Sequence, residues 1–372
     1  DIEDNADIMK IREALGIILQ RLITCLQTIS NVIQLHKAQV CLGWTHLQPA
    51  EPTTLGYRMA NYAQDLVLDV TSLENLLKIV KGKGFKGAVG TSASYTRLLD
   101  GKASPKDLEN QIASNLGLEV FPVSTQTYPR KIDFLVLSTL ASIAQTVAKF
   151  AFDLRIMQSP VFGELSEPIG KKQVGSSAMP SKRNPIYSER ICSLARYVAS
   201  LVSVAHGNAS NTLLERTIDD SANRRTIIPE AFLAVDECLM SYEKILSGIQ
   251  VYPEAMKRNL ERFGPFTSTE ALLMKLVERG EDRQEMHERF RDISFKAWDK
   301  VMKGEDNPML DLVMDDPSIK SKLEIVEVAA LLDPVKHIGD SIERCEHLVK
   351  EYIRPIIRRY SSKVKMSKGP EF

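Results

Sequence analysis

The sequence has no surplus of charge of either sign. Among its 372 residues, 48 Lys and Arg balance 48 Asp and Glu. Proteins that bind polyanions or anionic membrane surfaces carry an excess of basic residues, so neither nucleic acid nor a membrane is an expected partner. The apolar fraction of 44% and the charged fraction of 26% are typical of a soluble globular protein with a large core.

Cysteines are few and scattered. No CxxC pair occurs, and no Cys/His cluster has the spacing of a zinc site; the five cysteines are Cys25, Cys41, Cys192, Cys238 and Cys345. A disulfide framework and a structural metal are therefore not expected. No secretory signal pattern is visible either, and a reducing compartment, the cytoplasm, fits best.

The sequence also lacks an uninterrupted apolar run long enough to cross a membrane. Its most apolar stretch, Phe134–Phe152, is broken by Gln145 and Lys149 and lies inside a longer helical pattern. We interpret that stretch as a buried helix of a bundle. Alternation of apolar and polar residues typical of strands is also missing over any useful length.

Long amphipathic helices dominate instead. Apolar residues recur every three or four positions, as in Ile11, Leu15 and Ile18. The third helix is apolar on nearly all sides, which predicts several neighbours from its own chain or from partner subunits. All are far longer than the globular average of about 11 to 12 residues; their expected ranges are 8–40, 54–81, 131–157, 185–206 and 219–246.

The pattern changes near residue 250, where helices become shorter and prolines recur. We therefore predict an all-α protein with a central long-helix bundle domain over 1–250, which carries the functional motifs, and a smaller C-terminal helical domain over 251–372. The segment 163–185 is rich in glycine and proline, so we expect a long irregular connection of the kind that is often functional.

One part of that connection, Gly175–Pro185, has the sequence GSSAMPSKRNP. Glycine and serines allow a ligand to approach the backbone, and Lys182 and Arg183 add positive charge. Asn184 and Pro185 suit the cap and first turn of a helix, whose free amides could bind an anion. From this segment alone, a polar surface loop that caps a helix is an equally good interpretation.

A second segment, Gly43–Ala50, reads GWTHLQPA and lies between two long helices. Its histidine, His46, is expected at a helix end rather than on a packed face. An imidazole has a pKa near working pH and suits proton transfer. Taken alone, however, His46 is more readily interpreted as a structural hydrogen-bonding residue.

These two segments together resemble the GSSxMPxKxNP and THxQPA motifs of the fumarase/aspartase superfamily. The resemblance implies that Ser176 is the general base and that His46 protonates the leaving group. It also implies that the loop closes over a dicarboxylate, with substrate contacts from Thr45, Ser177, Lys182 and Asn184.

Two further segments resemble the adenylosuccinate lyases within that superfamily. They are KRNP at 182–185, followed by SER at 188–190, and ERTIDDSANRR at 215–225. A solvated charged helix face is the plainer interpretation of the second segment. The resemblance implies that Arg216, Ser221 and Arg225 bind the nucleotide phosphate, that Arg190 faces the nucleotide and that Gln126 contacts substrate. Arginine forks suit phosphate, and Ser221 and Arg225, four residues apart, share a helix face.

The resemblance implies β-elimination of fumarate from adenylosuccinate and from the succinylated aminoimidazole carboxamide ribotide of purine biosynthesis. It implies no metal or organic cofactor, and a cytoplasmic homotetramer whose sites are shared between subunits. The alternatives are an argininosuccinate lyase-like enzyme and a non-catalytic helical scaffold derived from a lyase. The resemblance implies that members of the family also carry an N-terminal helical domain with a further active-site histidine, and the resemblance begins only after that domain.

Overall fold

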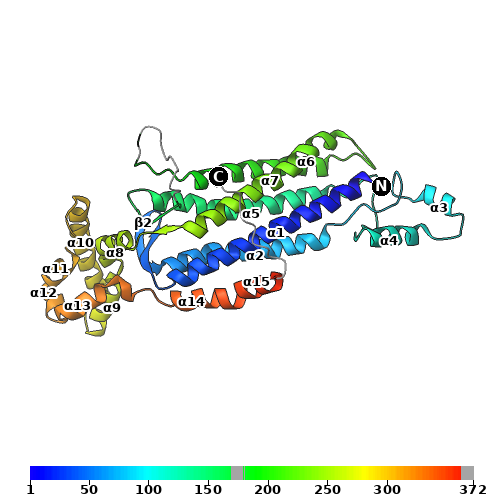
Figure 1. Ribbon diagram of the computed structural model, residues 1–372. Coiled ribbons are helices and arrows are strands. Elements are labelled where there is room, and N and C mark those ends of the chain that lie inside the picture. The colour runs from blue at the N-terminus through cyan, green and yellow to red at the C-terminus, as the bar shows by residue number, and fades with distance from the viewer. Residues whose placement is uncertain (169–178, 180, 362–372) are drawn as a thin grey trace.

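Five long helices form the body of the molecule (Figure 1). The computed structural model describes residues 1–168, 179 and 181–361. All five predicted long helices are present, with ends shifted by five residues or fewer: α1 (Glu3–His36), α2 (Leu55–Ile79), α5 (Lys131–Gln158), α6 (Ile186–Ser210) and α7 (Asp219–Gly248). The expectation of a mostly helical long-helix fold is confirmed.

The five helices enclose one apolar core. Each of α5 and α7 packs on two or more of the others, and α1 packs on α2 and α7. At its centre the ring of Phe150 meets the edges of Tyr62 and Tyr242, with centroids 5.3 and 4.9 Å away. By length and composition α1 and α5 could cross a membrane, but 56% and 50% of their apolar windows are buried in the chain. Core helices of soluble proteins share that property.

A β-hairpin joins α1 to α2, and here the expectation that no strand competes with the helices is wrong. Strand β1 (Val40–Thr45) pairs antiparallel with β2 (Gln48–Thr54), with an irregularity between Leu42 and Gly43. The backbone at Gly43 passes so close to Glu51 that an added Cβ would lie 2.4 Å from its carbonyl oxygen. A two-stranded ribbon tolerates the two prolines of β2 because both strands are edges.

A second, two-residue ribbon joins the segment that follows α5 to the segment that follows α7. Strand β3 (Leu165–Ser166) pairs antiparallel with β4 (Gln250–Val251). At the opposite end of the bundle, near the N-terminus, lie the short helices α3 (Ala93–Leu99) and α4 (Pro105–Asn115) (Figure 1). The two ends of the bundle are therefore built from different parts of the chain.

Beyond β4 the chain forms a separate small core. It is made by α8 (Pro253–Thr267), α9 (Thr269–Glu278), α10 (Arg283–Met302), α11 (Met309–Met314), α12 (Pro317–Lys320) and α13 (Ile325–Leu332). A 3₁₀ turn (Pro334–Lys336) follows, and the last helical segment then returns to the bundle: α14 (Ser341–His347), a π-helical turn (Leu348–Ile353) and α15 (Arg354–Tyr360). Cys345, Val349 and Ile353 of this segment belong to the bundle core. The domain division near residue 250 stays a proposal.

Candidate active site

The hairpin tip carries Thr45 and His46, both exposed. The prediction that His46 lies at a helix end is wrong. It occupies a two-residue turn with Leu47, and both residues have positive φ, 53° and 58°. Tight hairpins require positive φ at both central positions, usually supplied by Asn or Gly. Two bulky residues in this conformation indicate local strain, a feature that clusters at functional sites.

Aromatic packing fixes the hairpin to the end of the bundle. The Trp44 ring lies 4.8 Å from Phe162, just after α5, and 5.9 Å from Phe263 of α8. The Arg58 guanidinium donates to the Leu42 carbonyl at 2.6 Å and to buried Glu164 at 3.0 Å. A cleft of about 280 Å³ opens beside Trp44 and Leu47. The hairpin therefore presents its tip from a rigid base.

Lys182 and Asn184 lie at the same end of the bundle. Lys182 is exposed and Asn184 half-buried, and both line a cleft of about 550 Å³ together with Arg155 and Tyr252. Ser176 and Ser177 lie outside the described residues. The cationic side of the predicted loop thus faces an open cleft near the C-terminal end of α5.

The start of α6 differs from the sequence-based expectation. The helix begins at Ile186, and no side chain of the N-cap residue caps it, so the prediction of Asn184 as N-cap is wrong. The carboxylate of Glu167 instead accepts hydrogen bonds from the amides of Tyr187, at 3.1 Å, and Ser188, at 2.5 Å. These two amides are therefore already occupied and are not free for an anion.

Gln158 ties together the two described stems that flank 169–178. Its Nε2 donates to the carbonyl of Arg183 at 3.0 Å, and its Oε1 accepts from the amide of Glu167 at 3.0 Å. Glu167 in turn holds the first turn of α6. One side chain at the end of α5 thus sets the spacing between the residues that enter and leave this segment.

The second group of predicted residues lies at the opposite end of the bundle. Gln126 is exposed, and its amide donates to the carbonyl of Glu215 at 3.2 Å. Arg216 follows directly, and Ser221 and Arg225 share one face of the first turns of α7. Arg225 is 71% exposed and pairs with Glu3 at 3.1 Å. Gln126, Arg216, Ser221 and Arg225 are therefore brought to one end.

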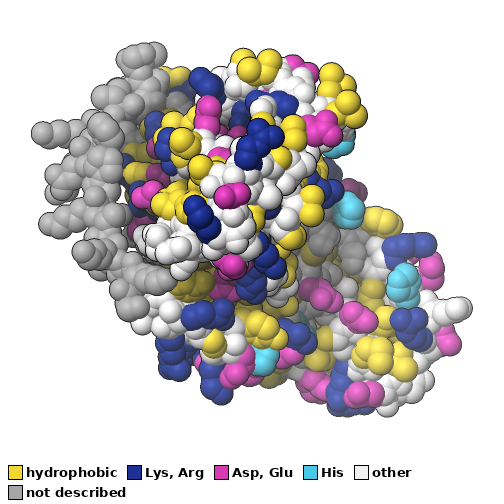
Figure 2. All heavy atoms as spheres, turned by 90° about the vertical axis from the view of Figure 1, so that its right-hand side faces the viewer, with side chains coloured by type: hydrophobic (Ala, Val, Ile, Leu, Met, Phe, Trp, Pro, Cys, Tyr) yellow, Lys and Arg dark blue, Asp and Glu magenta, His cyan; other side chains and the backbone are white. Residues whose placement is uncertain are grey.

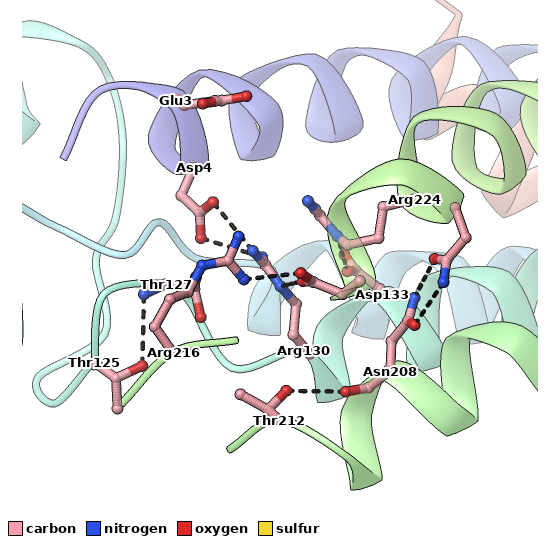
Figure 3. A network of polar contacts seen from close by, with 12 residues as sticks. Glu3, Asp4, Thr125, Thr127, Arg130, Asp133, Asn208, Thr212, Arg216 and Arg224 are labelled. Atoms are coloured by element: carbon pink, nitrogen blue, oxygen red, sulfur yellow. Dashed lines mark hydrogen bonds and ion pairs between the residues drawn. The ribbon is translucent and has the colours of Figure 1, made fainter. Parts of the chain in front are cut away.

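A chain of ion pairs underlies this end (Figure 3). Neither Asp219 nor Asp220 caps α7, whose N-cap residue is Ile218. Asp220 is buried, and its two oxygens accept from Arg130 Nε at 2.6 Å and from Arg216 at 2.8 Å. Burial alone would raise the pKa of Asp220, but the attraction of Arg130 and Arg216 outweighs it and lowers that pKa.

A parallel set of contacts lies deeper. Asp133, fully buried at the start of α5, accepts from the hydroxyl of Tyr128 at 2.6 Å and from Arg224 Nε at 2.6 Å. Burial alone would lower the pKa of Arg224, yet electrostatic attraction to the Tyr128 oxygen and to the Asp133 carboxylate raises it above its ordinary value. The two buried carboxylates, Asp133 and Asp220, thus join α7 to the start of α5 beneath the exposed residues.

Viewed onto this end, basic side chains are interspersed with acidic ones (Figure 2). No single broad basic face is visible in that view. An anionic ligand at this end would therefore be attracted by individual arginines rather than by a long-range positive field.

Arg190 does not join the other predicted arginine residues within the chain. It lies near the start of α6, half exposed, and pairs with Glu237 of α7 at 2.9 Å. Arg216 lies beyond the end of α6, after Ser210. A helix of 25 residues at 1.5 Å per residue is roughly 37 Å long. Within one chain, the phosphate-binding candidates therefore lie at the opposite end of the bundle from Thr45, His46, Lys182, Asn184 and Arg190.

Sequence reasoning missed the residues that support both ends: Asp4, Arg130, Asp133, Gln158, Glu167 and Arg224. The i, i+4 spacing of Arg216 and Asp220 was a usable signal for one of their contacts. The contact between Asp4 and Arg130, 126 residues apart, has no local signature.

Comparisons with known proteins agree across most of the chain. Residues 6–199 match a family described as lyase, and residues 265–348 match the adenylosuccinate lyase C-terminus. Adenylosuccinate lyase from Schistosoma mansoni is 41% identical over 96% of this chain and 75% of its own length. The Saccharomyces cerevisiae adenylosuccinate lyase is 38% identical over 96% of the chain and 74% of its own length.

Solved structures share the fold. The 3-carboxy-cis,cis-muconate lactonizing enzyme of Pseudomonas putida superimposes with a TM-score of 0.82 at 23% identity, covering 96% of this chain and 75% of that one. A fumarate lyase from Mesorhizobium sp. BNC1 gives a TM-score of 0.80 at 24% identity, covering 96% and 76%. At this identity the likeness concerns the arrangement of helices alone.

Proposed function

This chain belongs to the adenylosuccinate lyase family of the fumarase/aspartase superfamily, and from that premise we propose how its residues share the elimination of fumarate. The family implies a nucleotide substrate and a carbon–nitrogen lyase reaction. The substrates are adenylosuccinate, which yields AMP, and the succinylated aminoimidazole carboxamide ribotide of purine biosynthesis. Cytoplasm is the proposed compartment.

Ser176 removes the proton from the succinyl carbon next to the carbon that bears nitrogen. The electron pair is held in the adjacent carboxylate, stabilised by Lys182 and Asn184. It then forms the carbon–carbon double bond as the carbon–nitrogen bond breaks, and His46 supplies a proton to the departing nitrogen. Serine is a weak base, so the site must exclude water and direct donors at its oxygen.

The nucleotide is held at the other end of the substrate. Arg216, Ser221 and Arg225 bind the phosphate, which arginine recognises through paired N–H donors. Thr45, Gln126, Ser177 and Arg190 contact the rest of the substrate. The exposure of Gln126 and Arg225 and the partial exposure of Arg216 are compatible with this role.

A single observation carries the assembly part of the proposal. Lys182 and Asn184, proposed to hold the succinyl carboxylates, and Arg216, proposed to bind phosphate, lie at opposite ends of α6, roughly 37 Å apart along the helix axis. No nucleotide reaches that far. A complete site must therefore combine at least two copies of the chain, as in a homotetramer. Only half of the apolar window of α5 is buried within the chain, which leaves surface for such contacts.

Complementation between inactive variants tests this arrangement. Ser176→Ala and Arg216→Ala are each expected to lose nearly all fumarate release from adenylosuccinate. Mixed oligomers formed by co-expression should regain a fraction of the activity, because some sites then receive both intact halves. Mixed oligomers without any regained activity would contradict shared sites, and full turnover by Ser176→Ala would remove that residue from the role of base.

A matched assay separates the alternatives. Fumarate absorbance is followed with adenylosuccinate and with argininosuccinate as substrates. Turnover of argininosuccinate alone would support the argininosuccinate lyase-like reading, and turnover of neither would support a scaffold.

A further inference from the structure

We propose that Asp220 is a positioning residue that orients the guanidinium of Arg216 toward the substrate phosphate. The inference rests on the proposed function of Arg216 and adds the group that determines its geometry. Figure 3 shows Arg130 and Arg216 close together, with Asp4 nearby.

Both oxygens of Asp220 are used, and both partners are arginines. Oδ2 accepts from Arg130 Nε at 2.6 Å and Oδ1 accepts from an Arg216 terminal nitrogen at 2.8 Å. The Asp220 side chain is 1% exposed, whereas that of Arg216 is 25% exposed. A guanidinium has five N–H donors in a fixed plane, so Asp220 engages one edge and leaves donors that solvent or a phosphate can reach.

Arg130 gives Asp220 a fixed anchor. Its terminal nitrogens donate to the two carboxylate oxygens of Asp4 at 3.1 and 3.3 Å, and its guanidinium lies 4.6 Å from the ring centroid of Tyr128. The Arg130 side chain is almost fully buried. Because Asp4 and Tyr128 hold Arg130 on two sides, Arg130 fixes the orientation of the Asp220 carboxylate. Asp220 in turn fixes the orientation of the Arg216 guanidinium.

Charge explains why a carboxylate is needed between the two arginines. Asp4, Arg130, Asp220 and Arg216 alternate in sign and together are neutral. Without the Asp220 charge, Arg130 and Arg216 would face each other as two cations in a poorly solvated place, and Arg216 would turn away. With the Asp220 carboxylate present, Arg216 stays in place, and its remaining N–H donors can still attract a phosphate dianion.

The backbone around Arg216 has its own supports. Asn208 and Asn223 exchange side-chain hydrogen bonds at 2.6 and 3.0 Å, which join the end of α6 to α7. Thr212 donates to the carbonyl of Asn208 at 2.9 Å. The loop therefore does not depend on Asp220 for its path, and removal of the Asp220 charge acts mainly on the Arg216 side chain.

Asp220→Asn tests the inference, with Asp219→Asn as the matched control. The control makes the same chemical change one residue earlier, at an exposed position. We expect Asp220→Asn to raise the KM for adenylosuccinate and the Kd for AMP by about tenfold or more, because a charge-assisted contact loses its alignment. The kcat should change by no more than about threefold, and the control should match the unmodified protein.

Two further variants separate the possible failures. If Arg216→Ala leaves AMP affinity unchanged, the proposed function of Arg216 fails and the inference fails with it. If Arg216→Ala weakens AMP binding but Asp220→Asn does not, only the inference is overturned. In the double variant, the effect of Asp220→Asn on AMP affinity should vanish. An effect that persists without Arg216 would show that Asp220 acts through the fold, and would also overturn the inference.

Discussion

Asn184 and Arg216 lie at opposite ends of the same helix. Asn184 precedes the first residue of α6, and Arg216 follows its last turn across a short loop. The helix is straight enough in Figure 1 to keep the two ends of the bundle well apart. Under the proposed function each chain therefore offers two incomplete halves of a site, with the long-helix bundle between them.

His46→Gln is expected to lower kcat by about 10² to 10⁴, the usual contribution of one positioned proton donor. Glutamine keeps a polar side chain of similar reach but cannot deliver a proton. Fumarate absorbance under saturating adenylosuccinate measures the effect.

Leu47→Asn is the control for damage to the turn at residues 46 and 47. Asparagine tolerates positive φ better than leucine, so we expect activity within a few-fold of the unmodified protein. A His46→Gln variant that keeps full kcat would exclude His46 as the proton donor.

Gln158→Ala should disturb the residues that flank 169–178. It removes the two hydrogen bonds that join Glu167 to Arg183. We expect kcat to fall at least tenfold, while thermal unfolding shifts by only a few degrees, since each partly exposed hydrogen bond contributes about 1 kcal/mol. Gln145→Ala, an exposed substitution on the same helix, should change neither. Equal kcat values for the two variants would refute this role of Gln158.

Asp69→Asn tests a buried carboxylate between α2 and α5. Burial, aided by the charge of Asp65, raises the pKa of Asp69 to about 6, and the nearby hydroxyls of Thr146 and Ser142 offset this only in part. The folded protein thus holds the proton at a pH where the unfolded chain, with a pKa near 4, has released it. Stability therefore falls as pH rises from about 4 to 6 and is constant above.

Removal of that carboxylate should stabilise the protein above pH 6, by on the order of 1–3 kcal/mol. Urea unfolding at pH 4.5 and pH 8 provides the measurement, and the gain should shrink strongly at the lower pH. Asp299→Asn, exposed on α10, serves as control. A loss of stability in Asp69→Asn at pH 8 would contradict the prediction.

Two glycines should respond in opposite directions to alanine. At Gly56 an added Cβ would lie 2.5 Å from the Cα of Lys37, a backbone atom, so Gly56→Ala should destabilise the contact between α1 and α2 by about 1–3 kcal/mol. At Gly16, inside α1, nothing lies within 4 Å of the added carbon, so alanine should stabilise the helix by about 0.5–1 kcal/mol. Melting temperatures of the two variants, compared with the unmodified protein, decide the signs.

The long helices could be predicted because their apolar residues recur at helical spacing over many turns. The same residues, from Ile11 to Leu22, are buried in α1. The hairpin could not be predicted this way. Its strands are short, two prolines interrupt the second one, and its turn uses His46 and Leu47 in place of the usual Asn and Gly. Short strands leave too few alternations for a pattern to emerge.

The site could be predicted in part, since its motifs are continuous runs of sequence. Gln126, Arg216, Ser221 and Arg225 do meet at one end of the bundle. The Glu167 carboxylate that takes the place of an Asn184 cap, and the Arg130 contact with Asp220, depend on residues that only the tertiary structure brings together. The separation of the two halves also follows from the direction of α6, which a motif does not contain.

Because the last helical segment returns to the bundle, the small core between residues 272 and 332 is an insertion between two parts of the bundle rather than a C-terminal extension. Val349, Ile353 and Ile356 complete the wall over α1 and α2. A chain that ends just after the small core would lose this C-terminal helical segment. Apolar side chains of the bundle would then be exposed to solvent, and the shortened protein is expected to aggregate. A deletion that removes only the small core and rejoins the flanking residues would leave the C-terminal helical segment on the bundle. This deletion should therefore destabilise the bundle less than the truncation does.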